Sequence, residues 1–406
     1  MRVAFWGNFG TLNLGNECTL AAAVSNVRTR LPDGELTAIC VEPADTAARH
    51  GIASIPMSEP RLLPAGANRS KLWRRLRRLA DEALAFVRAL REASRIDVLL
   101  ITGCGILSDH DEGTLGLPYE LFKWSLAVKL RRKKLFFLSV GAESIDRPIS
   151  RAFIKGALGL ADYRSYRDLH SMQRLQRLGI RTDRDVICPD LAFSLSLPAA
   201  STHGDAPADG GGLRRRWVAV GLFNYRGRAL ENRADEAAYQ AYLDHICSLI
   251  LWLLAHEYGV RVVIGDLAFD PGVRSDVRAG LARRGLELNN PWYADEMAVS
   301  FEQVMQQLST VDFVIASRYH NVLLALLLGK PALSMSYEAK NEALMSDLGL
   351  GDYCQTLDEL DLEQLLQQFQ RLERNADSLR ALMAERAAAN RASLGRQYDL
   401  VAGSIQ

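Results

Sequence analysis

Long hydrophobic runs are missing from this sequence. None of its segments reaches about 18 consecutive apolar residues, so we expect no membrane-spanning helix. Charge of one sign is not in excess either, because 49 Lys and Arg against 48 Asp and Glu leave a net charge of +1. That balance gives no general attraction for nucleic acid. The chain opens directly into an apolar strand at Arg2–Trp6, without the hydrophobic segment of a signal peptide, and we expect a cytoplasmic protein.

Cysteine is sparse and follows no pattern. The six cysteines are scattered, and no two of them form a C-x-x-C pair: Cys18, Cys40, Cys104, Cys188, Cys247 and Cys354. This usage favours reduced thiols over a disulfide framework or a zinc site. Asp109, His110 and Asp111 are close in sequence, but consecutive side chains point in different directions, so they do not predict a metal site. We expect neither a metal nor a cofactor.

What the sequence does contain is a repeated alternation of strand and helix patterns. The N-terminal half has buried-strand patterns at Arg2–Trp6, Leu36–Val41, Asp97–Thr102, Lys134–Val140, Tyr163–Arg167 and Val186–Pro189. The C-terminal half has them at Trp217–Phe223, Val260–Asp266, Leu286–Asn289, Val311–Ala316 and Pro331–Ser336. Amphipathic stretches follow most of these strands, which predicts doubly wound parallel sheets of the α/β class.

One segment interrupts the alternation. Residues 198–216 are rich in Gly, Pro, Ala and Asp, a composition typical of a linker. The chain is also long for a single core. We therefore predict an N-terminal α/β domain over 1–197, a linker over 198–216, a C-terminal α/β domain over 217–357, and a helical tail over 358–406 that packs across the junction. Two such Rossmann-like domains facing a cleft would form a GT-B-like arrangement.

The polar residues at two strand ends in the C-terminal domain are the strongest candidates for a site. Arg318 and His320 follow the strand Val311–Ala316, and Glu338 and Lys340 follow the next one. Ligands of open α/β sheets bind at the carboxyl ends of strands. Helix N-termini at the same edge favour an anion. A structural alternative for Arg318 is a salt bridge to Glu338 or Asp312.

A long helix predicted over Ser70–Ala93 carries a second possible function. Its apolar residues recur at helical spacing, and its first half is basic over Lys71–Arg78, with Trp73 among the basic residues. This pattern fits a helix lying on an anionic membrane surface. It equally fits a crossover helix with a solvated outer face, and the sequence leaves both readings open.

Several segments, in their order and spacing, resemble the polysaccharide pyruvyl transferase family. The segments are Asn13-Leu14-Gly15-Asn16-Glu17, Thr102-Gly103-Cys104-Gly105, Ser139-Val140-Gly141, Tyr166-Arg167-Asp168, Pro189-Asp190-Leu191-Ala192-Phe193, Ser317-Arg318-Tyr319-His320, Gly329-Lys330-Pro331 and Ser336-Tyr337 with Lys340. The resemblance spans roughly Arg2 to Leu350. Asn16, Cys104 and Glu143 depart from the family pattern, and all three lie on the side where the family is expected to hold the acceptor.

The resemblance implies ketal formation from phosphoenolpyruvate on a sugar of a cell-surface polysaccharide or exopolysaccharide, with release of phosphate. His320 would be the general acid/base, since a histidine pKa lies near neutrality. The phosphoenolpyruvate contacts would be Arg318, Lys340, Arg226 and Arg228, because guanidinium groups match carboxylate and phosphate. The acceptor, a sugar or a lipid-linked oligosaccharide, would lie near Asn13, Asn16, Glu17, Gly103, Gly105, Asp109 and His110.

Two other functions remain open. A GT-B glycosyltransferase would use the same helix N-termini for the diphosphate of a nucleotide sugar and Glu338 for its ribose. A non-catalytic scaffold of a polysaccharide-assembly complex would dock through the basic helix Lys71–Arg78. We expect a cytoplasmic protein, and peripheral contact of the basic helix, residues 71–78, with the inner membrane surface remains one of the two readings of that helix.

Overall fold

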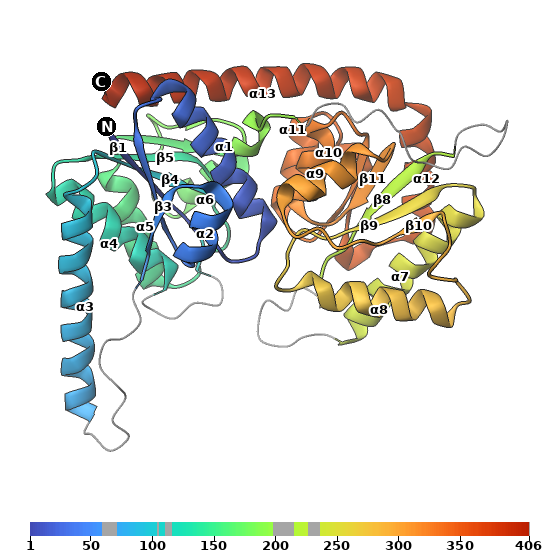
Figure 1. Cartoon of the computed structure of the whole chain (residues 1–406), viewed down its shortest axis with the longest axis horizontal. Coiled ribbons are helices and arrows are strands. Elements are labelled where there is room, and N and C mark those ends of the chain that lie inside the picture. The colour runs from blue at the N-terminus through green and yellow to red at the C-terminus, as the bar shows by residue number, and fades with distance from the viewer. Residues whose placement is uncertain (59–70, 104, 110–115, 198–214, 226–235, 406) are drawn as a thin grey trace. The chain divides into compact units, whose positions relative to one another are not determined.

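The computed structural model describes residues 1–58, 71–103, 105–109, 116–197, 215–225 and 236–405 (Figure 1). These residues form two compact units. The N-terminal unit consists of Met1–Thr11, Thr19–Leu191 and Ser393–Gln406, and the C-terminal unit of Leu12–Cys18 and Ala192–Ala392. Most of the predicted linker, residues 198–214, lies outside the described residues. The grouping differs from the predicted domains in assigning Leu12–Cys18 to the C-terminal unit and the chain end to the N-terminal unit.

The N-terminal unit is built on a seven-stranded parallel sheet of order β3-β2-β1-β4-β5-β6-β7. Its strands are β1 (Arg2–Trp6), β2 (Glu35–Cys40), β3 (Ala53–Pro56), β4 (Val98–Thr102), β5 (Lys134–Val140), β6 (Tyr163–Tyr166) and β7 (Val186–Ile187). Its helices are α1 (Leu14–Arg30), α2 (Pro43–His50), α3 (Lys71–Ala93), α4 (Leu117–Leu130), α5 (Pro148–Leu160) and α6 (Leu169–Arg177). A short 3-10 turn, Leu191–Ser194, follows β7.

The C-terminal unit repeats this plan. Its six-stranded parallel sheet has the order β10-β9-β8-β11-β12-β13. The strands are β8 (Trp217–Gly221), β9 (Gly259–Val263), β10 (Tyr293–Ala294), β11 (Phe313–Ala316), β12 (Ala332–Ser336) and β13 (Cys354–Thr356). The helices are α7 (Glu236–Ala255), α8 (Asp270–Arg283), α9 (Phe301–Ser309), α10 (Tyr319–Leu327), α11 (Ala339–Asp347), α12 (Leu362–Arg374) and α13 (Ala376–Ile405).

The apolar character of the strands explains why each sheet lies at the centre of its unit. Every residue of β4, β11 and β12 is buried, as expected for strands covered on both faces. The core of the N-terminal unit includes Leu99 and Ile101 of β4 together with Trp124 of α4 and Ile154 of α5. The predicted α/β class with two Rossmann-like domains is confirmed.

The end of helix α13 belongs to the N-terminal unit because its polar side chains reach the sheet. Gln397 accepts a hydrogen bond from the Ser165 hydroxyl at 2.5 Å and donates one to Ser139 Oγ at 3.2 Å. Both serines are buried, so these bonds satisfy hydroxyl groups that water does not reach. The residues from Ser393 onward are therefore tied to β5 and β6.

One local expectation was wrong, and several short elements were not predicted. Helix α2 and strands β3, β10 and β13 were missed because they are short and lack a clear apolar period. No strand forms at Leu286–Asn289: Gly285, at φ 89°, follows the end of α8, and the amide of Leu286 donates back to the Leu281 carbonyl. The strand in that region is β10 instead. Within the described residues, no helix is long and apolar enough to cross a bilayer.

Candidate functional site

The order of the second sheet defines a switch point between β8 and β11. Strand β9 lies on the far side of β8, and β12 on the far side of β11, so the connections leave this point in opposite directions. Open α/β sheets bind their ligands at such a point, at the carboxyl ends of the strands. Four side chains follow these strands closely: Phe223 after β8, Asp266 after β9, Arg318 after β11 and Tyr337 after β12. The sheet therefore assembles one polar and aromatic edge.

Arg318 is held by a buried carboxylate. Asp270, at the start of α8, accepts from Nε of Arg318 at 3.1 Å and from Nη2 at 2.6 Å. The Asp270 side chain is wholly buried, and that of Arg318 is 14% exposed. The guanidinium also lies over the Phe223 ring, 4.5 Å from its centroid. Burial by itself lowers the pKa of Arg318, but the charge of Asp270 outweighs it, so the pKa is raised and the cation persists.

Asp266 connects this ion pair to the N-terminal segment. Its Oδ2 lies 3.6 Å from Arg318 Nη2 and accepts a hydrogen bond from Asn13 Nδ2 at 3.1 Å. The Asn13 Oδ1 accepts from the amide of Gly15 at 3.0 Å, so Asn13 caps the start of α1. Burial raises the pKa of Asp266, against the lowering effect of Arg318. Asn13 was predicted on the acceptor side, but the structure places it beside Arg318 within the C-terminal unit.

His320 packs directly against the backbone of Gly15. A Cβ atom added at Gly15 would lie only 2.1 Å from His320 Nδ1, so the imidazole occupies the space that only glycine leaves open there. The His320 ring also meets the Tyr319 ring edge-on, with centroids 5.1 Å apart. His320 is in the first turn of α10, immediately after Arg318 and Tyr319. The imidazole is therefore fixed next to a helix N-terminus that favours anions.

Aromatic stacking links Arg318 to Lys340. The rings of Phe223 and Tyr337 stack at 4.0 Å with an interplanar angle of 17°. Lys340 Nζ lies 5.3 Å from the Tyr337 centroid and pairs with Glu338 Oε2 at 2.6 Å. Arg318 and Lys340 thus belong to one layered cluster, as their strand-end positions predict. Phe223 is itself held by its amide, which donates to the Tyr242 hydroxyl at 2.9 Å.

The suggested partners of Arg318 were wrong. Glu338 pairs with Lys340, and Asp312 Oδ2 accepts from the amide of Trp217 at 2.8 Å. Sequence reasoning missed Asp266 and Asp270. A signal was present, since Asp266 follows the apolar run of β9 and Asp270 begins the next helix, but nothing in the sequence shows that β9 and β11 flank the same strand.

The carboxyl edge of the first sheet carries a second group of residues. Gly103, with φ 135°, and Gly105, with φ 65°, follow β4 in conformations that favour glycine. A Cβ at Gly105 would lie 2.3 Å from Glu143 Oε1, so the Glu143 carboxylate rests on the Gly105 backbone. Gly141 similarly leaves room for Arg167, whose Nη2 would be 2.9 Å from an added Cβ. Gly103 and Gly105 were predicted as acceptor-side residues, whereas Glu143 was not assigned a role.

Asp109 has a structural use in this unit. Its Oδ1 accepts from the amide of Asp146 at 3.0 Å, and its Oδ2 from the amide of Arg147 at 2.8 Å. Burial raises its pKa, but these two amides outweigh burial, so the pKa of Asp109 is lowered. The carboxylate therefore ties the loop after β4 to the start of α5.

The other predicted site residues are placed as follows. Asn16 and Glu17 lie in the first turn of α1, with Glu17 buried. His110, Arg226 and Arg228 lie outside the described residues. Among the residues that are described, no group of three His, Cys, Asp or Glu side chains could hold a metal ion, and the five cysteines described are free thiols.

The strand edge of the C-terminal unit combines two chemical capacities, anion binding and proton transfer. Buried and half-buried cations, Arg318 and Lys340, lie with the N-termini of α10 and α11, which together favour a ligand carrying negative charge. An imidazole is fixed beside them by Gly15. An anionic ligand at this edge would therefore meet a group able to transfer a proton.

Comparison with solved structures shows the fold. A glycosyltransferase from Rickettsia africae matches with a TM-score of 0.62 and 10% identity, covering 100% of this chain and 98% of its own. HepE of Anabaena, in complex with UDP and glucose, matches at 0.59 and 12% identity over 98% and 99% of the two chains. The UDP-GlcNAc 2-epimerase of Methanocaldococcus jannaschii matches at 0.56 and 11% identity over 91% and 92%.

No curated protein matches the sequence. A family model does: the model described as polysaccharide pyruvyl transferase matches residues 13–339, from the asparagine that caps α1 to the first residue of α11. This span contains the switch point, Arg318 and His320, and it covers most of the 406 residues. The chain therefore belongs to the polysaccharide pyruvyl transferase family, a family of transferase enzymes.

Proposed function

We propose that this transferase uses phosphoenolpyruvate to form a pyruvate ketal on a sugar of a cell-surface polysaccharide or its precursor. The observation that carries the proposal is the family match over residues 13–339. The cluster of Arg318, His320 and Lys340 at one strand edge supports it, because phosphoenolpyruvate brings two anionic groups and a methylene carbon that must gain a proton.

In the proposed reaction, two hydroxyl groups of one sugar form two C–O bonds to the central carbon of phosphoenolpyruvate. The bond from that carbon to the phosphate oxygen breaks, and phosphate leaves. One hydroxyl proton is balanced by the proton that converts the methylene to a methyl group, and the other leaves with phosphate. His320 is the proposed general acid/base for the methylene or the leaving phosphate.

Arg318 and Lys340 are the proposed contacts of the carboxylate and phosphate. Neither Asp270 nor Asp266 engages Nη1 of Arg318, so this nitrogen is the one we assign to the ligand. Asp270 keeps the guanidinium in place and charged. Lys340 comes one residue after the end of the family match and supplies the second cation. Arg226 and Arg228 remain proposed further contacts.

The acceptor is assigned to the N-terminal unit. The Gly103 and Gly105 backbone and the Glu143 carboxylate lie at the carboxyl edge of its sheet, where sugar hydroxyl groups would find acceptors and amide donors. The tether formed by Asp109 holds this loop, so its contribution to acceptor binding is indirect. His110 remains a proposed acceptor contact on the resemblance alone.

The test has two parts. Thermal-shift titrations compare phosphoenolpyruvate with UDP- and GDP-sugars, because a ligand that binds only the folded state raises the melting temperature. Phosphate release is then followed with phosphoenolpyruvate and a panel of sugar and lipid-linked acceptors. We expect stabilisation by phosphoenolpyruvate and acceptor-dependent phosphate release. Stabilisation by a nucleotide sugar alone would support a glycosyltransferase, and no response to any donor would support a scaffold.

His320→Gln gives the residue-level test. We expect turnover to fall by roughly 10²–10⁴-fold, the usual contribution of general acid–base catalysis, with phosphoenolpyruvate binding nearly unchanged. His256→Gln is the matched control, since His256 lies at the end of α7, stacked on Trp252 with centroids 3.9 Å apart. Wild-type turnover in His320→Gln would remove His320 from the proton transfer.

A further inference from the structure

Helix α3 exposes its apolar side. Leu79, Leu84 and Val87 are 67%, 42% and 59% exposed, and Ala80 and Ala83 are exposed as well. At 3.6 residues per turn these five residues fall within an arc of roughly 140° of the helix surface. We call them the outer face of α3. A crossover helix of a soluble domain normally turns charged residues outward, so this arrangement needs a cause.

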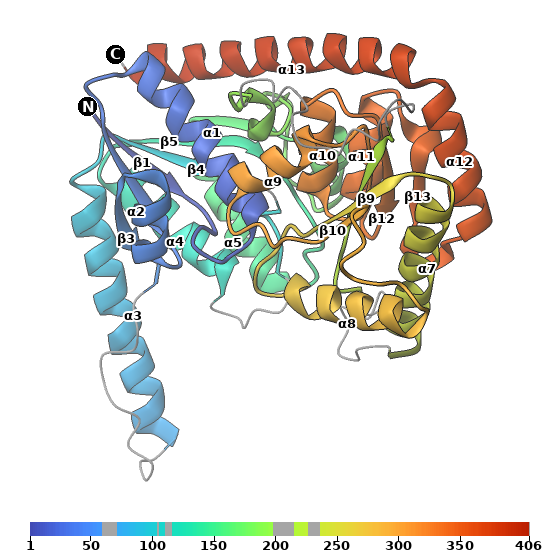
Figure 2. The same ribbon diagram turned by 45° about the vertical axis from the view of Figure 1, so that its right-hand side comes forward.

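Packing against the protein's own sheet does not supply that cause. Ala89 and Ala93 are buried in the core, and Phe86 and Leu90 pack against it, so the core takes only the C-terminal half of the helix. Phe86, Ala89 and Ala93 lie outside the arc of the outer face, whereas Leu90 lies within that arc but beyond Val87 along the helix. In both views the N-terminal half of α3 runs beyond the strands of its unit (Figures 1 and 2). The outer face therefore begins where contact with the sheet ends.

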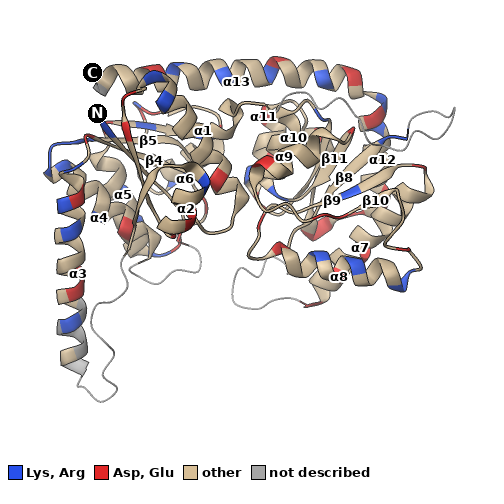
Figure 3. Cartoon of the chain, viewed as in Figure 1, with Lys and Arg blue, Asp and Glu red and all other residues tan. Residues whose placement is uncertain are grey.

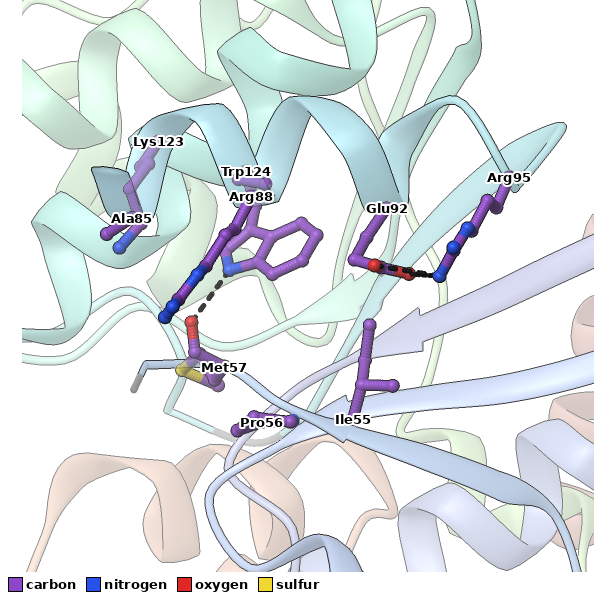
Figure 4. Close-up of a pocket in the computed structure, with 10 residues that line it drawn as sticks. Ile55, Pro56, Met57, Ala85, Arg88, Glu92, Arg95, Lys123 and Trp124 are labelled. Carbon is purple, nitrogen blue, oxygen red and sulfur yellow. Dashed lines mark hydrogen bonds and ion pairs between the residues drawn. The ribbon is translucent and has the colours of Figure 1, made fainter. Parts of the chain in front are cut away.

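The flank of α3 opposite the outer face is also accounted for. A pocket of about 260 Å³ lies between α3, α4 and the end of β3, lined among others by Arg88, Glu92 and Trp124 (Figure 4). Trp124 Nε1 donates to the Met57 carbonyl at 2.9 Å, and Glu92 pairs with Arg95 at 3.0 Å. A contact that joins α3 to its unit is a hydrogen bond from Arg131 Nε, after α4, to the Leu90 carbonyl at 3.0 Å, and it leaves the outer face uncovered.

The charge of α3 is strongly positive. The helix contains seven basic and three acidic residues, a net charge of +4, whereas the whole chain carries +1. Five of the basic residues fall within Lys71–Arg78, and the exposed Arg91 lies one turn beyond Val87. Basic and acidic positions alternate with uncharged ones along the helix in Figure 3. In the sequence, the outer face thus lies between the basic segment Lys71–Arg78 and Arg91.

These features together indicate what kind of partner binds the outer face of α3. A second copy of α3 would bring the same positive charge and be repelled at close range. An anionic lipid surface brings opposite charge at the headgroups and an apolar layer beneath them, which is the environment that an amphipathic basic helix binds. We propose that α3 docks the protein on anionic membranes, with the outer face in the headgroup–acyl boundary. This inference does not depend on the proposed reaction.

The structure also changes where the contact lies. One of the two readings left open by the sequence placed membrane contact at the basic residues Lys71–Arg78, whereas the exposed apolar residues come after them, from Leu79 to Val87. The basic segment supplies electrostatic attraction, and the outer face supplies insertion. Binding should therefore need both an anionic lipid and the apolar side chains, and high salt should weaken it.

Vesicle sedimentation tests the proposal with the full chain. Vesicles of phosphatidylglycerol and phosphatidylcholine are compared with vesicles of phosphatidylcholine alone. We expect binding to the anionic vesicles only. The triple variant Leu79→Ser, Leu84→Ser, Val87→Ser should lower the apparent affinity about tenfold or more, since it removes the buried apolar area. The control variant Leu130→Ser, Ile149→Ser, Leu169→Ser changes three residues that are 58%, 52% and 47% exposed elsewhere in the unit, and it should bind like wild type.

Two results would overturn the proposal. One is equal binding of the wild type and the α3 variant to anionic vesicles. The other is a dimer, detected by light scattering, that the α3 variant dissociates while neither form binds vesicles, because the outer face would then be an interface between copies. Melting temperatures of both variants, with and without phosphoenolpyruvate, show that the fold and the donor site are intact; we expect the two variants to match the wild type.

Discussion

Gly15→Ala should impair catalysis without removing any functional group. An alanine Cβ would lie 2.1 Å from Nδ1 of His320 and 2.7 Å from its Cγ. Ordinary contact begins near 3.4 Å, so the ring or the start of α1 must move by about 1.3 Å. Misplacement of a catalytic group by about 1 Å can cost 10²-fold in rate. We therefore expect kcat to fall about 10²-fold.

The change is otherwise favourable for the helix. Gly15 is the second residue of α1 and its φ is not positive, so its backbone conformation is one that alanine adopts readily. In a helix interior alanine is about 1 kcal/mol more favourable than glycine. The steric overlap offsets this with roughly 1–3 kcal/mol. Stability should consequently change by no more than about 2 kcal/mol, within the range that leaves a domain folded.

The assay is phosphate release from phosphoenolpyruvate, together with thermal shift for donor binding. Gly159→Ala is the control, since Gly159 lies in α5 and an added Cβ meets no atom within 4 Å. In the double variant with His320→Gln, the effect of Gly15→Ala should largely disappear, because both changes act through one side chain. A Gly15→Ala protein with wild-type kcat would refute the reasoning, and full additivity would show that Gly15 acts apart from His320.

Three further predictions concern the residues around the site. Asp270→Asn leaves the Arg318 cation buried without its main partner, so the free energy of unfolding measured in urea should fall by about 3 kcal/mol. As a control, Asp377→Asn, in an exposed pair with Arg380, should cost less than about 1 kcal/mol. Equal losses in the two variants would contradict a stabilising role for the buried pair. Lys340→Ala should raise KM for phosphoenolpyruvate roughly tenfold with a smaller change in kcat, as expected for an anion contact, and an unchanged KM would remove Lys340 from the donor site. Asp109→Asn should lower the free energy of unfolding at neutral pH. Because the folded-state pKa of Asp109 is lowered from its ordinary 3.8, the difference from wild type should shrink as the pH falls below about 4. A difference that persists in acid would mean that the carboxylate charge does not contribute.

The architecture was predictable because buried parallel strands leave a strong sequence signal. The runs at Val98–Ile101 and Phe313–Ala316 are apolar from end to end, and each precedes a helix. Short elements without that signal were missed: β3 is partly exposed and four residues long, and β10 has two residues. Such strands form because a neighbouring strand offers a partner, and that partner is known only once the fold exists.

The places of the candidate residues in the fold were predictable, but their contacts were not. Arg318, His320 and Lys340 stand out because they follow buried strands directly. Their contacts are not local: Asp270 comes from α8 and Gly15 from the start of α1. Asp270 is brought in by the order of strands, and Gly15 by the pairing of Asn13 with Asp266. The suggested partners Glu338 and Asp312 were chosen for their nearness in sequence, which is why they were wrong.

The central claim is that phosphoenolpyruvate is the donor and His320 moves its proton. The most direct measurement follows phosphoenolpyruvate consumption, phosphate release and product mass together in the presence of acceptor. We predict one phosphate released for each ketal-linked pyruvyl group gained by the acceptor, with both processes lost in His320→Gln and retained in His256→Gln. Transfer of a glycosyl group from a nucleotide sugar, with phosphoenolpyruvate untouched, would contradict the account.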